Sequence, residues 1–227
     1  LNDIPLSLSK ESLFRRMGYG GRQRLPAHEV LEQFDRAMVL IERESYIKAN
    51  YTLMIQEISL MSEKIIKLKD GCEIPGKRIF NIMPQATHLA IAIGTIGDKL
   101  ETISRDLVKQ GDPLIGVILD SIGSAAVDCL AEEISKHVSN CANEIGLMSS
   151  SPVSPGMSGL PLSSQQVIFS HLPADRIGVF LTASNMIIPF KSSSMIYGLG
   201  KAMPTWSKTK VCKACHLYKH CRYKIVN

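Results

Sequence analysis

The chain has 227 residues and a mass of 25.0 kDa; 45% of its residues are hydrophobic and 21% are charged. This length suits one large domain or two small ones, and the near-average composition excludes disordered, collagen-like and disulfide-dense classes. The most apolar stretches, 89–93 and 114–119, are far shorter than the roughly 20 residues of a membrane span. The sequence therefore predicts no transmembrane helix and no membrane partner.

The N-terminal residues also lack the pattern of a signal peptide, which joins a basic stretch to an apolar run of roughly 7–15 residues. We therefore expect a cytoplasmic protein. In that reducing compartment cysteines are thiols or metal ligands.

Charge and cysteine are concentrated at the C-terminal end. The net charge is +5, but residues 201–227 alone hold seven basic and no acidic residues, so residues 1–200 are slightly acidic. Three of the six cysteines also lie in this stretch. We predict two parts: a globular domain over 1–200 and a basic, cysteine-rich, metal-binding tail over 201–227.

The first part of the chain predicts a helix and then a strand. Pro26 suits a first helical turn, and apolar residues at steps of three and four follow it over 30–41. Residues 51–55 form a marginal strand pattern. Gly71, Pro75 and Gly76 predict a turn-rich connection.

The middle of the chain gives the clearest patterns. Residues 88–95 predict a buried strand, and Asp98 is placed to cap a helix that ends at Gly111. A second helix begins at Pro113 and keeps apolar spacing for about seven turns. Its first half is rich in small residues around Gly123, which favours close packing over contact with a ligand.

A loop rich in Ser, Pro and Gly covers 149–164, and a short helix is predicted over 165–172. Strand-like runs follow at 177–182, 186–189 and 195–197. Strands at both ends with helices between them predict an α+β fold.

Cys212, Cys215 and Cys221 form a C-x2-C-x5-C arrangement. Thiolates at this spacing can bind one metal centre, and the basic neighbours lower thiol pKa values. An iron–sulfur cluster would need a fourth ligand, such as Cys72, an external group or a second chain. Zinc would take His216 or His220 as the fourth ligand, and free thiols remain the third alternative.

Other familiar site patterns are missing from the sequence, including the dinucleotide fingerprint, the P-loop, H-E-x-x-H and G-x-S-x-G. No residue has the arrangement of a nucleophile with its base, so no catalytic group is predicted. The basic tail is small for a nucleic-acid surface, and we do not expect nucleic acid as a partner.

Several blocks in order resemble the reactivation (activation) domain of vitamin B12-dependent methionine synthase, and most closely its small stand-alone members from anaerobic microbes. The blocks are 93–101 (IGTIGDKLE), 111–114 (GDPL), 119–126 (LDSIGSAA), 154–157 (SPGM), 177–182 (IGVFLT) and 191–194 (KSSS). The cysteine tail resembles an extension of some stand-alone members.

The resemblance implies a curved antiparallel sheet flanked by helices. It also implies a role in reactivating a corrinoid protein whose cobalt has been oxidised from Co(I) to inactive Co(II). In the family the domain docks over the partner's cobalamin and presents S-adenosylmethionine, while a redox partner supplies an electron.

The resemblance places cofactor-binding residues in two segments, Pro155, Gly156 and Met157 in the first and Ser184, Asn185 and Met186 in the second. These segments and the helix near Gly123 are expected to form a concave docking surface.

This sequence departs from the family at the S-adenosylmethionine loop. Pro152 stands where the family has an arginine, Met157 where it has a tyrosine, and Ala183 where an acidic residue is usual. Proline cannot replace the charge-assisted contacts of an arginine to a carboxylate, which argues against tight S-adenosylmethionine binding.

Three hypotheses follow. The first is an accessory protein for a corrinoid protein or corrinoid-dependent methyltransferase, with an iron–sulfur cluster as electron relay. The second is a zinc-stabilised scaffold without redox activity, and the third keeps S-adenosylmethionine-dependent reductive methylation.

Overall fold

We describe residues 1–14, 17, 19, 26–76, 83–157, 159–205 and 219 of a computed structural model of the chain. Its helices and strands, in chain order, are α1 (Lys10–Phe14), α2 (His28–Glu44), β1 (Asn50–Met61), β2 (Ile65–Leu68), β3 (Glu73–Pro75), β4 (His88–Thr95), α4 (Lys99–Lys109), α5 (Pro113–Glu144), β5 (Met148–Ser149), α6 (Ser164–His171), the 3-10 helix η2 (Ala174–Ile177), β6 (Phe180–Leu181), β7 (Ile187–Ile188) and β8 (Ser192–Gly200).

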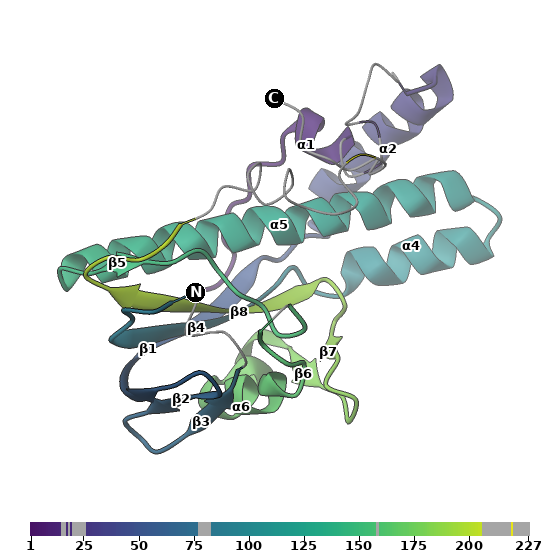
Figure 1. Ribbon diagram of the computed structural model, residues 1–227. Helices are drawn as coiled ribbons and strands as arrows, with labels where there is room; N and C mark the ends of the chain where they lie inside the picture. The colour runs from purple at the N-terminus through teal and green to yellow at the C-terminus, as the bar shows by residue number, and fades with distance from the viewer. Residues whose placement is uncertain are drawn as a thin grey trace.

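Six strands form one antiparallel sheet in the order β3-β2-β1-β4-β8-β5, and β6 and β7 pair in a small second sheet. Strand β1 is long enough to pair with two strands, β4 and β2, over different parts of its length. Its residues 50–57 pair with β4, and 58–61 pair with β2, with a register shift between Ile58 and Leu60. The predicted α+β class, a curved antiparallel sheet with flanking helices, is confirmed (Figure 1).

Strand β4 is buried on both faces, which explains its continuous apolar sequence. Because side chains alternate along a strand, Ala90 and Ala92 face the core under α5, whereas Leu89, Ile91 and Ile93 face the opposite core. The residues toward α5 are therefore small, and those toward the other face are large.

Helix α5 lies close against the small-residue face of the sheet, with α4 and α2 beside it (Figure 1). A Cβ atom added at Gly94 of β4 would lie 2.8 Å from the Ile134 side chain of α5. The buried apolar side chains of α5 include Ile118, Leu130 and Val138. The glycine and alanines of β4 let the helix approach the sheet this closely.

The other face of the sheet is covered by the connection from β5 to α6, by α6 and by η2 (Figure 1). Its core joins the large side chains of β4 to Ile66 and Ile74 of the β2–β3 hairpin and to Leu160 and Ile168 from the covering segments. The protein thus has one core on each side of the same strands.

The structure confirms some expected elements and corrects others. The helix after Pro26, the strand over 88–95 and the helix from Pro113 are confirmed. The turn-rich connection expected around Gly71, Pro75 and Gly76 is wrong in part: Gly71 lies in a turn, but Pro75 belongs to β3, which forms a hairpin with β2. The strand expected over 177–182 is also wrong in part, because η2 occupies its start and β6 is short.

By length and composition alone, α5 is long and apolar enough to cross a membrane. The short apolar stretches in the sequence do not indicate this, because polar residues interrupt the helix. It is the single helix of this kind in the part of the chain that the structure describes. Half of its most apolar window is buried inside the protein. Contact with the sheet and with α4 accounts for this apolar character.

The tightest packing of α5 is at Gly116, where α4 crosses it. A Cβ at this position would lie 2.8 Å from the Ser104 carbonyl oxygen and 2.7 Å from Val108. The Ser104 hydroxyl also donates a hydrogen bond of 2.8 Å to the Gly116 carbonyl. The preference for close packing over ligand contact in this half of the helix is therefore supported at Gly116.

Two alanine substitutions within α5 test this packing. Both gain roughly 1 kcal/mol of helix propensity. At Gly123 the new Cβ would meet the flexible stem of Lys191 at 3.3 Å and the Leu100 side chain at 3.5 Å, whereas at Gly116 it would meet backbone. We expect Gly123→Ala to leave the free energy of unfolding unchanged or higher, and Gly116→Ala to lower it by about 1–3 kcal/mol in urea denaturation. Equal effects of the two substitutions would contradict the close crossing of α4 and α5.

Candidate functional site

The loop that carries Pro155, Gly156 and Met157 is a compact turn between β5 and α6, here called the Gly156 loop (residues 154–162). The Gly156 N–H donates to the Leu160 carbonyl at 2.8 Å, and the Met157 N–H donates to the Ser154 carbonyl at 3.0 Å. Gly156 has a φ of 91°, a value that favours glycine. Backbone pairing of Val153 with Ile196 of β8 fixes the start of the loop to the sheet.

The β2–β3 hairpin lies across from this loop and is tied to it. The Ser164 hydroxyl donates a 3.0 Å hydrogen bond to the Pro75 carbonyl, which joins the start of α6 to β3. The Gly76 N–H donates to the Lys64 carbonyl at 2.8 Å. Because two segments distant in sequence are joined here, the space between them is a fixed feature of the fold.

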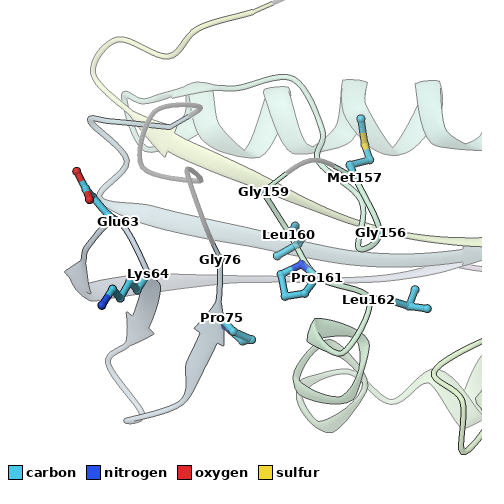
Figure 2. Close-up of a pocket in the computed structure, with 10 residues that line it drawn as sticks. All are labelled: Glu63, Lys64, Pro75, Gly76, Gly156, Met157, Gly159, Leu160, Pro161 and Leu162. Atoms are coloured by element: carbon cyan, nitrogen blue, oxygen red, sulfur yellow. The ribbon is translucent and has the colours of Figure 1, made fainter.

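A cleft of about 850 Å³ opens between the hairpin and the Gly156 loop (Figure 2). The residues that line it are Glu63, Lys64, Pro75, Gly76, Gly156, Met157, Gly159, Leu160, Pro161 and Leu162. Two of the three residues predicted in the first segment, Gly156 and Met157, thus line this cleft, and Pro155 lies in the turn beside them.

The lining of this cleft is mainly apolar. The Met157 side chain is 50% exposed and Leu162 is 37% exposed, so both present apolar surface to the cleft and to solvent. Glu63 and Lys64 are the only ionisable residues in the described lining. Figure 2 shows their charged ends extending away from the Gly156 loop.

Polar contacts connect the turn of the β2–β3 hairpin to α6 and β1. Asp70 accepts a hydrogen bond from the Cys72 N–H at 2.9 Å and lies 3.0 Å from Nε2 of His171, the last residue of α6. The Cys72 N–H, with the Gln56 side-chain amide, holds the pKa of the Asp70 carboxyl below its usual range. Burial and the neighbouring Asp70 carboxylate raise the pKa of the Cys72 thiol.

The second predicted segment lies elsewhere. Ser184, Asn185 and Met186 form the tip of the β6–β7 hairpin, where the Thr182 side chain bonds to the Ser184 hydroxyl and to the Met186 N–H. Asn185 adopts a left-handed conformation with a φ of 63°. None of these three residues is among the described lining of the cleft.

The β6–β7 hairpin exposes an apolar face. Phe180 pairs directly with Ile188 across the two strands, so both side chains lie on one face. They are 58% and 45% exposed, and Met186 and Phe190 beside them are also exposed. This face is a second candidate contact surface, apart from the cleft.

The helix near Gly123 does not contribute an open surface. The Lys191 stem lies over Gly123, and its ammonium bonds to Asp120 at 2.7 Å and to the Ser124 hydroxyl at 2.9 Å. Lys191, the residue before β8, thus covers Gly123 itself, and a role of this part of α5 in docking stays a prediction.

Cys212, Cys215 and Cys221, with His216 and His220, lie outside the residues that the structure describes. Within the described residues, no group of three or more His, Cys, Asp and Glu side chains could hold a metal ion. Cys72, one candidate for a fourth cluster ligand, lies between β2 and β3 at one edge of the sheet, whereas residues 204–205 leave the opposite edge beyond β5.

The hairpin wall of the cleft was missed in the sequence, although a signal was present. Asp70-Gly71 is a dipeptide typical of β-hairpin turns, and short β-prone segments flank it. In the structure, Lys69, Asp70 and Gly71 connect the two strands, and Gly71 has a positive φ. Pairing that dipeptide with its flanks would have predicted β2 and β3. It would not have predicted that Pro75 and Gly76 face the Gly156 loop.

The sequence matches no protein-family model and no curated protein. Thirteen chains of solved structures match the fold. One is the crystal structure of the MetH reactivation domain bound to AdoHcy, which aligns with a TM-score of 0.63 and 11% identity over 91% of this chain and 82% of that chain. At this identity the likeness establishes the fold: the chain has the fold of the MetH reactivation domain.

Proposed function

We propose that this protein is an accessory factor for the reductive reactivation of a corrinoid protein or corrinoid-dependent methyltransferase. The observation that carries the proposal is the fold likeness to the MetH reactivation domain, which extends over 91% of this chain. The ordered sequence blocks, which resemble the same domain, support the proposal independently of the fold. Fold alone does not determine function, so the argument depends on the surfaces as well.

Two surfaces suit docking on such a partner. The Gly156 loop forms one wall of the cleft of about 850 Å³, and the apolar face of the β6–β7 hairpin is available for burial. Because Gly156 and Met157 are held by backbone hydrogen bonds, the loop has one defined shape before a partner binds. Such preorganisation lowers the entropic cost of association.

Cobalamin would be carried by the partner, where it supplies the cobalt chemistry, and this chain would bind and orient the partner beside it. The residues present do not fit S-adenosylmethionine in the way the family binds it. Pro152 has no charge to offer a carboxylate, and it lines a separate groove of about 370 Å³ between the end of α5 and β5. The role proposed here is therefore docking and electron supply, without S-adenosylmethionine as methyl donor.

The electron would reach the partner through the cysteine tail. Cys212, Cys215 and Cys221 at C-x2-C-x5-C spacing in a basic setting support an iron–sulfur cluster as relay. The fourth ligand would be Cys72, an external group or a second chain.

Docking is tested by a matched pair of glycine substitutions. Gly156 in the loop and Gly146 after α5 both have positive φ, 91° and 69°, and no atom lies nearer than 3.8 Å to a Cβ at either site. Alanine at either position introduces similar backbone strain, about 1–2 kcal/mol. We expect comparable losses in Tm but at least tenfold weaker binding only for Gly156→Ala. Binding is measured by calorimetry against a methionine-synthase-type corrinoid protein in the Co(II) state.

Failure of the unsubstituted protein to bind this corrinoid protein would contradict the proposed function. Equal weakening of binding by Gly156→Ala and Gly146→Ala would remove the Gly156 loop from the interface.

The relay is tested on protein purified anaerobically and supplied with iron and sulfide. We expect near-stoichiometric iron and a broad visible charge-transfer absorbance, both lost in Cys212→Ala and both retained in Cys141→Ala, which changes a cysteine of α5. One zinc per chain, without visible absorbance, would instead favour the non-redox scaffold. Absence of both metals would leave the tail thiols free and end the relay hypothesis.

A further inference from the structure

The cleft between the Gly156 loop and the β2–β3 hairpin has the size and lining of a small-molecule site. Its volume of about 850 Å³ falls within the usual range for ligand pockets, roughly 300–1,000 Å³. Most of its described lining is Gly, Pro, Leu and Met. We propose that this cleft binds an uncharged, apolar small molecule, and that it excludes zwitterionic ligands of the AdoHcy type.

The charges of the lining argue against a zwitterion. AdoHcy ends in an amino acid, whose carboxylate and ammonium must both be paired when they leave water. Glu63 and Lys64 are the only ionisable residues in the described lining, and their charged ends extend away from the Gly156 loop (Figure 2). Pro152, at the position of the family's arginine, lines the other groove.

The backbone of the loop offers no substitute for these charges. The N–H groups of Gly156, Met157 and Leu160 already donate to carbonyls within the loop, at 2.8, 3.0 and 3.0 Å. A carboxylate placed against them would have to break those bonds. These three N–H groups are therefore not free to hold an anion in the way that a glycine-rich turn usually does.

Exposed apolar side chains in the cleft favour an apolar ligand. Met157 and Leu162 stand partly in water, and a ligand that covers them gains about 25 cal/mol for each Å² removed from solvent. The nearest atom to a Cβ at Gly156 is in the Leu162 side chain, 3.8 Å away, so the loop leaves room for contact beside Leu162. Met157 is also a flexible side chain that adapts to ligands of different shape.

This inference goes beyond docking on a corrinoid protein, because it concerns a small molecule held by this chain alone. It also separates the chain from its structural neighbour, which was crystallised with AdoHcy. The two domains would share a fold and differ in the chemistry of the ligand that each binds.

The test uses two probes on the full chain. N-phenyl-1-naphthylamine is an uncharged fluorescent molecule whose emission rises in apolar sites, and AdoHcy is titrated by calorimetry. We expect saturable binding of N-phenyl-1-naphthylamine with one site per chain, and no binding heat from AdoHcy at millimolar concentration. Met157→Glu places a charge in the cleft and should weaken binding of the fluorescent probe at least tenfold.

A matched control separates the cleft from other apolar surface. Ile145, after α5, is 53% exposed, similar to Met157, but does not line the cleft. Ile145→Glu should leave probe binding within twofold of the unsubstituted protein. Equal effects of the two substitutions, no saturable probe binding, or AdoHcy heat with micromolar affinity would each overturn the proposal. None of these results bears on corrinoid docking, which is measured separately.

Discussion

The fold depends on burial of β4 on both of its faces. Ala90, Ala92 and Gly94 leave one face nearly flat, so a long apolar helix can lie against it, and the larger residues on the other face require a second covering layer. That second layer is built from the connection after β5, α6 and η2. The same requirement that buries β4 therefore also holds the Gly156 loop in place beside the β2–β3 hairpin.

The candidate site follows from this layer. Leu160 is buried in the second core, while its neighbours Met157 and Leu162 remain exposed, so the loop is anchored by one residue and presents the others. The hydrogen bond from Ser164 to Pro75 fixes the opposite wall at a set distance. A fixed apolar cleft suits a ligand or partner that is recognised by shape more than by charge.

Much of the fold could be predicted from the sequence, because periodicity reports burial. The strand over 88–95 and the helix from Pro113 follow from apolar spacing alone, and the structure confirms both. The β2–β3 hairpin and the covering of Gly123 by Lys191 could not be predicted in this way, since each depends on contacts between distant segments. For the same reason, the sequence grouped Gly156 with Ser184–Met186, whereas the structure faces Gly156 toward Pro75 and Gly76. Long-range pairing, and not local propensity, decides which loops share a cleft.

The central proposal is that this chain assists reduction of the cobalt in a partner's corrinoid. The most direct measurement is the rate at which a low-potential electron donor converts a Co(II) corrinoid protein to Co(I), followed by the visible spectrum of the corrinoid. With this chain present, we expect a faster conversion, whose rate saturates as the concentration of the chain exceeds that of the corrinoid protein. A rate that does not change at saturating concentrations of the chain would contradict it.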